Sequence, residues 1–188
     1  MNSTKKPAKI AFVGTSCVGK TSLFESLRKK YQKNSKIYFV EEAARVYYLT
    51  HPQVRNRFAF ITQSPIQKQA QQLETEAQRS LTRIIICDRS VLDAAAYVYT
   101  RGGKSGAQKL MTRMKDWIST YTEIYLLDPK DIPYFSDEIR QESVEERVKF
   151  HEGFIKLFFE HNIPFQLLSG TLDQRLEFME KQISQFIT

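Results

Sequence analysis

The stretch that most restricts the fold of this chain is the octapeptide GTSCVGKT at residues 14–21. It fits the pattern G-x-x-x-x-G-K-[ST], in which backbone N–H groups wrap the phosphates of a nucleotide. Such a loop needs a strand before it and a helix after it. KIAFVG at residues 9–14 is a short apolar run typical of a buried parallel strand, and apolar residues recur at helical spacing between residues 23 and 31. The beginning of the chain therefore predicts a strand–loop–helix unit.

Four more apolar runs predict four more strands. They lie at residues 36–42, 83–88, 123–128 and 163–170. Segments with helical periodicity separate them, so the sheet is expected to be mostly parallel and covered by helices on both faces. The sequence thus predicts one α/β domain over residues 1–188, a three-layer phosphate-loop NTPase sandwich with five parallel strands.

Capping signals mark where several helices begin. Ser64, Pro65 and Gln67 resemble an N-cap, a first-turn proline and a capping-box partner, which predicts a helix over residues 64–81. Residues 143–146 and 171–174 carry similar caps. RGGKSG at residues 101–106 is rich in glycine, and we expect a flexible connector there.

Composition sets the broad class of protein. With 41% hydrophobic and 12% aromatic residues, the 188-residue chain can bury a core. Its apolar runs are shorter than the roughly 18 residues of a membrane helix and the roughly 7–15 residues of a signal-peptide core, so we expect a cytoplasmic protein. Cys17 and Cys87 make neither a disulfide framework nor a metal-binding set, and we expect reduced thiols.

Positive charge is concentrated near the N-terminus. The net charge is +7, and residues 1–36 contain nine basic residues but one acidic residue. A basic cluster can face a polyanion such as nucleic acid, or it can be a solvated helix end. Because aromatic and basic residues do not alternate here as in a nucleic-acid module, we favour the solvated helix end.

The loop itself supplies the candidates for nucleotide binding. Backbone N–H groups cradle the β-phosphate, Lys20 bridges the β- and γ-phosphates, and Thr21 holds Mg²⁺. The pattern is compatible with ATP and with GTP. The expected nucleotide-binding residues are Gly14, Thr15, Ser16, Cys17, Val18, Gly19, Lys20, Thr21 and Ser22.

A second metal-contacting acid is expected at the end of a neighbouring strand. Asp88 follows IIIC and Asp128 follows YLL, and both end a predicted strand. We favour Asp88, because Arg89 and a helix follow it, whereas proline and a long loop follow Asp128. Thr21 and Asp88 are therefore the predicted metal-binding pair.

Two acids also close the second predicted strand. Because carboxyl ends of parallel strands face the ligand crevice, Glu41 or Glu42 could accept the proton of an attacking hydroxyl or hydrogen-bond the substrate. Arg45 lies one turn beyond Glu41 on the same side of the expected helix. The alternative is an ordinary surface ion pair.

The segment between the fourth and fifth strands has the size of a closing lid, over about residues 129–150. It contains Arg140 and Arg147. Arginines on such a lid can stabilise the charge that develops during phosphoryl transfer, and closure excludes water.

Taken together, these motifs resemble the AAA-type ATP-binding domain family that includes the ribosylnicotinamide kinase domain of bacterial NAD-biosynthesis regulators. The resemblance runs over nearly the whole chain: FVGTSCVGKTSL, VEEAARVYY, CDRSVLDAAAY, the lid segment and LLSGTLDQRLE all have counterparts. It places Glu42, Arg45, Arg140 and Arg147 at matching positions and implies a nucleotide-kinase-like fold. The DRS segment is also similar to deoxynucleoside and thymidylate kinases, which by analogy makes Arg89 a candidate for binding the acceptor or the phosphates.

The leading hypothesis is a kinase that transfers the γ-phosphate of Mg-ATP to a nucleoside, a nucleotide or a ribosylnicotinamide-like compound. Glu41, Arg45 and Arg89 would bind the acceptor, within an acceptor region at about residues 41–105. The expected catalytic residues are Lys20, Glu42, Asp88, Arg140 and Arg147. Two alternatives stay open: a nucleotide-dependent switch or binding module, although the guanine signature Asn-Lys-x-Asp is missing from the sequence, and an ATPase or nucleic-acid end kinase.

Overall fold

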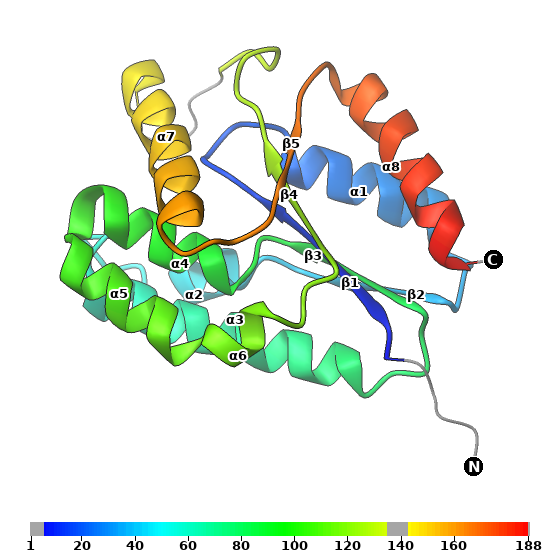
Figure 1. Ribbon diagram of the computed structural model, residues 1–188, viewed down its shortest axis with the longest axis horizontal. Helices are drawn as coiled ribbons and strands as arrows, with labels where there is room; N and C mark the ends of the chain where they lie inside the picture. Colours follow the sequence, from blue (N-terminus) through cyan, green and yellow to red (C-terminus); the bar gives the residue numbers. More distant parts are fainter. Residues whose placement is uncertain (1–5, 135–142, 188) are drawn as a thin grey trace.

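A computed structural model describes residues 6–134 and 143–187 of the chain. Five strands form a single sheet in the order β2-β3-β1-β4-β5 (Figure 1). The strands are β1 (Ala8–Val13), β2 (Ile37–Val40), β3 (Ile84–Asp88), β4 (Glu123–Leu127) and β5 (Gln166–Leu168). All four pairings are parallel, so every strand ends at the same edge of the sheet. The order puts β1 in the centre, which confirms the predicted α/β class.

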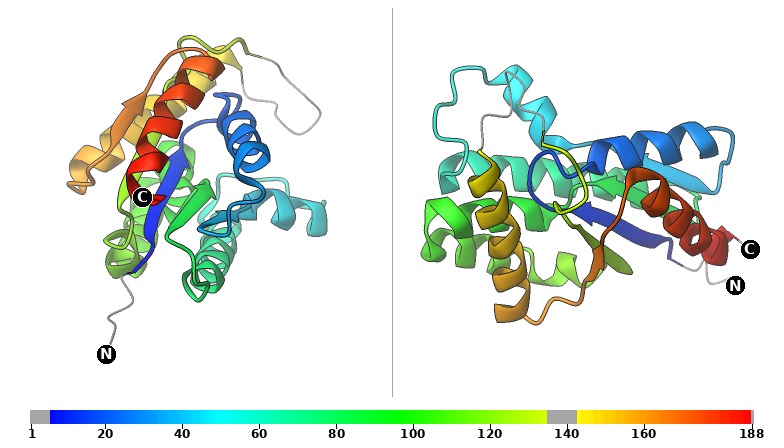
Figure 2. Two further views of the ribbon diagram at one scale, coloured as in Figure 1. Left: turned by 90° about the vertical axis from the view of Figure 1, so that its right-hand side faces the viewer. Right: turned by 90° about the horizontal axis from the view of Figure 1, so that it is seen from above.

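Helices cover both faces of this sheet (Figure 2). α1 and α8 pack against one face, and α3, α4, α5 and α7 contribute to the core on the other. A π-helical turn, η1, continues α4. The bounds are α1 (Lys20–Tyr31), α2 (Ala43–Thr50), α3 (Phe60–Gln78), α4 (Val91–Tyr97), η1 (Val98–Gly102), α5 (Lys104–Arg113), α6 (Lys115–Ile118), α7 (Val144–Glu160) and α8 (Leu172–Ile187).

The central strand shows why the sheet is buried on both faces. Successive side chains of a strand point to opposite faces. Ile10 and Phe12 pack into the core beneath α1 and α8, whereas Ala11 and Val13 pack into the core beneath α3, α4 and α7. A continuous apolar run is therefore what such a strand needs, and the runs seen in the sequence predicted all five strands. β5 is shorter than its apolar run, covering only Gln166–Leu168.

The start of α3 differs from the prediction. The helix begins at Phe60, four residues before Ser64, and Pro65 lies inside it. The N–H groups of Thr62 and Gln63 donate to the carbonyl of Ala59, at 3.0 and 2.9 Å, which starts the helix earlier. Ser64 does not cap the helix; its hydroxyl accepts a hydrogen bond from Arg113 on α5 at 2.9 Å. A tertiary contact thus explains the serine that looked like a local cap.

The expected flexible connector at residues 101–106 is also wrong, because all of these residues except Gly103 belong to η1 or to the first turn of α5. The glycines serve close packing here. A Cβ at Gly102 would collide with the carbonyl oxygen of Phe58, and one at Gly106 would lie 2.9 Å from Val98 Cγ1. Glycine composition alone does not distinguish a loop from a tight helix contact.

The predicted caps of the last two long helices are confirmed. Ser143 and Glu146 form a reciprocal capping box at the start of α7, and Thr171 and Gln174 exchange hydrogen bonds at the start of α8. The predicted lid is described only over residues 129–134 and 143–150, so Arg140 lies outside the described residues. Within the described ranges, no helix has the length and apolar character to cross a membrane.

Two members of the basic cluster near the N-terminus, Arg28 and Lys30, pair with acids at the surface. Arg28 forms ion pairs with Glu25 and Glu41, at 3.0 and 2.7 Å, and Lys30 pairs with Glu180 of α8 at 2.5 Å. These side chains are largely solvated. Arg28 and Lys30 lie in the last turn of α1, and the preference for a solvated helix end over a polyanion-facing surface stays a prediction.

Candidate nucleotide and acceptor site

The phosphate loop connects the end of β1 to the start of α1, with its backbone in conformations that only some residues tolerate. Gly14, Cys17 and Gly19 have positive φ values of 138°, 56° and 83°. A Cβ at Gly14 would lie 3.3 Å from the carbonyl oxygen of Leu127 on β4. Glycine therefore suits both a left-handed backbone and a close approach. The helix N-terminus directs backbone N–H groups toward the crevice, a geometry that binds anions.

Lys20 lies buried within this loop. Its Nζ donates hydrogen bonds to the carbonyls of Gly14 and Thr15, at 2.8 and 2.5 Å. Burial, followed by the positive charge of Arg89, lowers the pKa of Lys20 to about 7. An anion in the cradle would oppose both effects, because it would stabilise the ammonium form. The lysine is thus placed to respond to bound phosphate.

Thr21 and Asp88 meet at the adjacent strand end. The Thr21 hydroxyl donates to Asp88 Oδ2 at 2.9 Å, and Asp88 Oδ1 is buried without a hydrogen-bond partner among the described residues. Burial and the neighbouring Glu42 raise the pKa of Asp88. A hydroxyl and a carboxylate are hard oxygen ligands of the kind that Mg²⁺ binds together with phosphate and water. The unpaired oxygen of Asp88 fits such an ion.

The alternative acid, Asp128, has a different environment. Its Oδ2 accepts from Ser169 at 2.9 Å and its Oδ1 accepts from the Lys130 N–H at 3.0 Å. Both bonds belong to the turns after β4 and β5. The structure brings Asp88, and not Asp128, to the hydroxyl of Thr21. No group of three or more His, Cys, Asp or Glu side chains gathers for a metal anywhere in residues 6–134 and 143–187.

Glu42 and Arg89 form an ion pair beside the phosphate loop. Arg89 Nε lies 2.5 Å from Glu42 Oε1, and Arg89 Nη1 also reaches Asp93 at 3.3 Å and the hydroxyl of Tyr97 at 3.2 Å. Arg89 adopts a left-handed backbone, with φ of 74°, at the turn from β3 into α4. Burial alone would lower the pKa of Arg89, but Glu42 and the other acids outweigh it and raise that pKa further. Glu42 is therefore held beside a permanent cation.

The structure places the two adjacent acids, Glu41 and Glu42, in different environments. The Glu42 side chain is 13% exposed and faces Arg89. The Glu41 side chain is 67% exposed and pairs with Arg28 of α1. Arg45 is exposed on α2 at the rim of the crevice. Of the residues assigned to the acceptor, the structure thus places Arg89 deep in the crevice, and Glu41 and Arg45 at its edge.

A pocket of about 350 Å³ opens next to the phosphate loop. On the side of the phosphate loop, the pocket is bordered by Ser16, Glu42, Asp88 and Arg89. Glu74 of α3 also lines it. The walls come from the end of β2, from α2 and its following loop, from α3 and from α4. Much of the apolar lining is small or flat: Ala43, Ala44, Phe58, Ala70 and Ala94.

The polar part of this pocket is already organised by hydrogen bonds. Gln63 of α3 donates to the hydroxyl of Tyr48 at 3.1 Å and to the carbonyl of Arg57 at 2.6 Å. Burial raises the pKa of Tyr48 to about 12, so its hydroxyl stays protonated at neutral pH. An amide and a phenol are donors and acceptors that suit a neutral polar ring or a sugar hydroxyl.

Tyr97 connects the pocket with α7, whose first turns belong to the predicted lid segment. Its ring centroid lies 5.8 Å from that of Phe58 and 5.0 Å from that of Phe150 on α7. Its hydroxyl lies 3.4 Å from the Ser16 hydroxyl in the phosphate loop. One aromatic side chain thus touches three functional segments.

Arg147 lies at the start of α7 and is buried. Its Nη2 donates to the carbonyl of Pro129 and, at 2.8 Å, to that of Ile132. In this structure Arg147 therefore anchors the loop after β4. Its guanidinium also lies 6.0 Å from the ring centroid of Tyr134.

Gln63, Asp93 and Tyr97 were not among the residues that the sequence singled out. Asp93 and Tyr97 lie one turn apart on α4, on the side that contacts Arg89, and Asp93 is also the capping-box partner of Ser90. That spacing was the available signal. The sequence carried no signal for Gln63, because Gln63 belongs to α3 only through the early start of that helix at Phe60.

Comparisons with known proteins agree with this architecture. NadR in complex with NR superposes with a TM-score of 0.74 at 15% identity, over 97% of this chain and 50% of that chain. NadR in complex with NAD and AMP-PNP gives 0.73 at 16% identity, over 96% and 49%. Deoxyadenosine kinase from M. mycoides with products dCMP and a flexible dCDP gives 0.67 at 12% identity, over 94% and 99%.

The chain spans about half the length of the NadR chains. At these identities the likeness concerns the fold, which is that of phosphate-loop kinases, and it agrees with the resemblance seen in the sequence. A search of curated proteins finds no match. Residues 9–175 match the AAA domain family, from the central strand to the first turn of α8. The chain therefore belongs to the AAA domain family.

Proposed function

We propose that this chain is a small-molecule kinase that transfers the γ-phosphoryl group of Mg-ATP to a hydroxyl group of an acceptor. The observation that carries the proposal is the pocket of about 350 Å³ beside the phosphate loop. A nucleotide switch needs a site for its nucleotide alone. A second concave site, with apolar walls and a few convergent polar groups, is what a small acceptor requires.

The donor half would hold the nucleotide through backbone N–H groups of residues 14–20 and through Lys20. Thr21 and Asp88 would hold Mg²⁺, which neutralises charge on the β- and γ-phosphates when bound. Ser22 follows on the exposed side of α1, next to the cradle. This assignment uses the buried Lys20 and the unpaired Asp88 oxygen described above.

Phosphoryl transfer would take place between the nucleotide held by the donor half and an acceptor hydroxyl beside Glu42. The acceptor oxygen attacks the γ-phosphorus, the bond from that phosphorus to the β–γ bridging oxygen breaks, and ADP leaves. The proton of the acceptor hydroxyl passes to the carboxylate of Glu42, which acts as general base. Arg89, whose Nε lies 2.5 Å from Glu42 Oε1, orients this carboxylate.

The pocket favours an acceptor that combines a flat ring with hydroxyl groups, such as a nucleoside, a nucleotide or a pyridine riboside. Alanines on α2, α3 and α4 leave room for a ring, and Phe58 offers an aromatic face. Tyr48 and Gln63 provide hydrogen-bonding groups on one wall. The compounds in the NadR and deoxyadenosine kinase structures belong to the same broad chemical group.

Arg140 and Arg147 would act over the phosphates when the segment of about residues 129–150 closes. Arg147 already lies where this segment joins the β4 end of the crevice, through its bonds to Pro129 and Ile132. Positive charge supplied at that position stabilises the transition state more than the ground state, so it acts on turnover.

The test is a transfer screen with γ-labelled ATP over nucleosides, nucleotides and pyridine ribosides, with the Lys20→Ala variant as the matched inactive protein. We expect the label in an organic phosphate ester, with one ADP per ester formed. Label found only as inorganic phosphate would identify an ATPase and contradict the proposal. Label transferred only to the ends of nucleic acid would identify an end kinase instead.

A further inference from the structure

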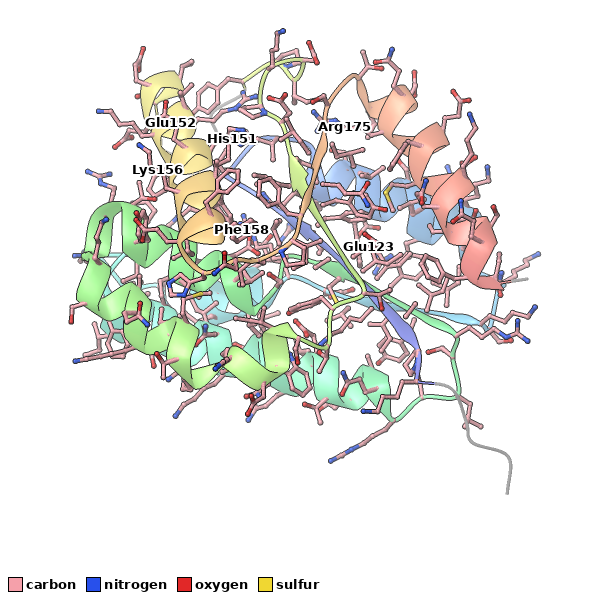
Figure 3. The ribbon with its side chains drawn as sticks, in the orientation of Figure 1. Glu123, His151, Glu152, Lys156, Phe158 and Arg175 are labelled. Atoms are coloured by element: carbon pink, nitrogen blue, oxygen red, sulfur yellow. The ribbon has the colours of Figure 1, made fainter. Side chains whose placement is uncertain are left out.

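Arg175, in the first turn of α8, is the largest side chain that is completely buried in the described part of the chain. Figure 3 shows it beside the segment that leads from β5 into α8. Its Nη1 donates to the carbonyl of Val18 and its Nη2 to the carbonyl of Asp128, both at 2.6 Å. One guanidinium therefore joins the phosphate loop to the end of β4.

The bond to Val18 has a consequence for the next N–H group. In a trans peptide the C=O and the N–H point in opposite directions. Because Arg175 holds the Val18 carbonyl on the side of α8, the N–H of Gly19 points away from α8. That N–H belongs to the row that cradles phosphate in a loop of this pattern.

Glycine at position 19 does little by itself to fix this orientation. It has a φ of 83° and serves as the N-cap of α1 without a side-chain hydrogen bond, and glycine visits many backbone conformations at little cost. The position of a Cβ at Gly19 would lie 3.7 Å from Arg175 Nη1. The guanidinium thus sits directly against the most adaptable residue of the loop.

The base from which Arg175 reaches the loop is itself tied down. The N–H of Arg175 donates to the Thr171 carbonyl at 3.0 Å, Ser169 donates to Asp128 at 2.9 Å, and the N–H of Gly170 donates to Asp131 at 3.1 Å. These bonds fasten the turn before α8 to the loop after β4. The backbone of Arg175 is therefore fixed, and so is Asp128, whose carbonyl accepts a hydrogen bond from the guanidinium.

A buried guanidinium with neutral acceptors is costly for a purely structural role. Its hydrogen-bond acceptors are two backbone carbonyls, and its Nε has no hydrogen-bond partner within residues 6–134 and 143–187. An apolar side chain could fill the same space between α1 and α8. The free-energy cost of burying the Arg175 guanidinium is explained if this side chain fixes the backbone conformation of the phosphate loop.

We propose that Arg175 is a positioning residue for nucleotide binding, which orients the Val18–Gly19 peptide so that the Gly19 N–H donates to the β-phosphate. It acts through the backbone and does not contact the acceptor. This inference rests on the proposed binding of nucleotide by the loop, and it adds a residue from the opposite end of the chain to that site.

The test compares Arg175→Met with Met179→Ala, which removes a fully buried side chain one turn further along α8. Dissociation constants for ATP, ADP and AMP are measured by calorimetry, and melting temperatures by circular dichroism. We expect Arg175→Met to weaken ATP and ADP about tenfold, as loss of a charged hydrogen bond does, and AMP, which has no β-phosphate, less than twofold. We expect Met179→Ala to lower the melting temperature without changing the affinity for ATP.

Wild-type affinity for ADP in Arg175→Met would overturn the inference, as would an equal loss of affinity in Met179→Ala or an equal loss for AMP. If Arg175→Met does not fold, Arg175→Lys carries the test, because lysine keeps the charge but offers a single donor atom. Unchanged ADP affinity in that variant would also overturn the inference. Failure of the wild-type protein to bind any nucleotide would instead contradict the proposed function itself.

Discussion

The two halves of the crevice are built in different ways. The phosphate cradle of the donor half is a continuous stretch, residues 14–21, whose buried Lys20 and positive-φ glycines follow from one motif, and Asp88 joins it from the end of β3. The acceptor half gathers side chains from β2, α2, α3 and α4, between residues 40 and 97, together with Ser16. The first half depends on backbone geometry and the second on side chains that meet only in the folded chain.

This difference explains why phosphate binding is readable from the sequence and acceptor choice is not. A cradle of N–H groups needs glycine at fixed intervals, which leaves a spacing in the sequence. A pocket wall needs only side chains of suitable size, and Ala43, Ala70 and Ala94 are unremarkable at their positions in helices. Variants that affect one half and spare the other can therefore test the division.

The largest effect is expected from Lys20→Ala in the donor half. Removing the ammonium group should lower phosphoryl transfer about 1000-fold, because its charge stabilises the transferring phosphate. The melting temperature should not fall, since burial disfavours the charged form of Lys20 in the folded chain. Steady-state kinetics and thermal unfolding measure the two results. Lys29→Ala, on the exposed side of α1, is the control, and transfer near the wild-type rate in Lys20→Ala would refute the donor site.

Glu42→Gln should have the next largest effect, at the point where the halves meet. It removes the general base while keeping the size of the side chain, and we expect kcat to fall about 100-fold. Glu41→Gln is the matched control, because Glu41 is adjacent in sequence but exposed and paired with Arg28. We expect it to cost less than threefold. Equal losses of kcat in the two variants would contradict the assignment of Glu42, and not Glu41, as the general base.

Ala70→Leu should disturb the acceptor half alone. Ala70 lines the pocket on the same side of α3 as Ile66 and Glu74, so a larger side chain takes the space of the acceptor. We expect KM for the acceptor to rise about tenfold, the effect of a few lost contacts, with an unchanged dissociation constant for ATP. Gln72→Leu, on the exposed side of α3, should leave both constants unchanged. A parallel loss of ATP affinity in Ala70→Leu would show that the two halves are not separate.

The pH dependence of ATP binding should show the smallest effect, confined to the donor half. The pKa of Lys20 is lowered to about 7, so the free site is half protonated at pH 7 and mostly neutral at pH 8. If phosphate binds the ammonium form, affinity falls about fivefold from pH 7 to pH 8, and binding takes up a proton in that range. Calorimetry in buffers of different ionisation enthalpy measures this uptake. Proton release on binding would contradict the assignment of Lys20.

The sequence predicted the parts of the molecule that depend on local patterns. Five apolar runs became five parallel strands, and the capping boxes at Ser143 and Thr171 start α7 and α8 as expected. The predictions that relied on glycine and proline were wrong, because tertiary contacts override local preference at those positions. Gly102 permits close packing against Phe58, and Pro65 lies within α3 rather than at its start.

The site followed the same rule. The pairing of Thr21 with Asp88 could be anticipated, since parallel strands end at one edge and Asp88 ends the neighbour of β1. The resemblance favoured Glu42 over Glu41 as the catalytic acid. The different environments of the two side chains needed the structure, because they depend on which way the chain turns after β2. Arg175 lies in the segment LLSGTLDQRLE that carries part of the resemblance, but nothing in that segment singled it out, since its partners Val18 and Asp128 lie far from it in sequence.

The central claim is that the phosphate leaving the donor half arrives on a molecule seated in the acceptor pocket. The most direct measurement is the ratio of labelled ester to labelled inorganic phosphate formed from γ-labelled ATP, at fixed acceptor concentration, in wild-type protein, Ala70→Leu and Gln72→Leu. We predict that ester dominates in wild-type and Gln72→Leu protein and falls about tenfold in Ala70→Leu. Equal ester formation by all three proteins would place the acceptor elsewhere, and inorganic phosphate as the sole product would contradict the kinase.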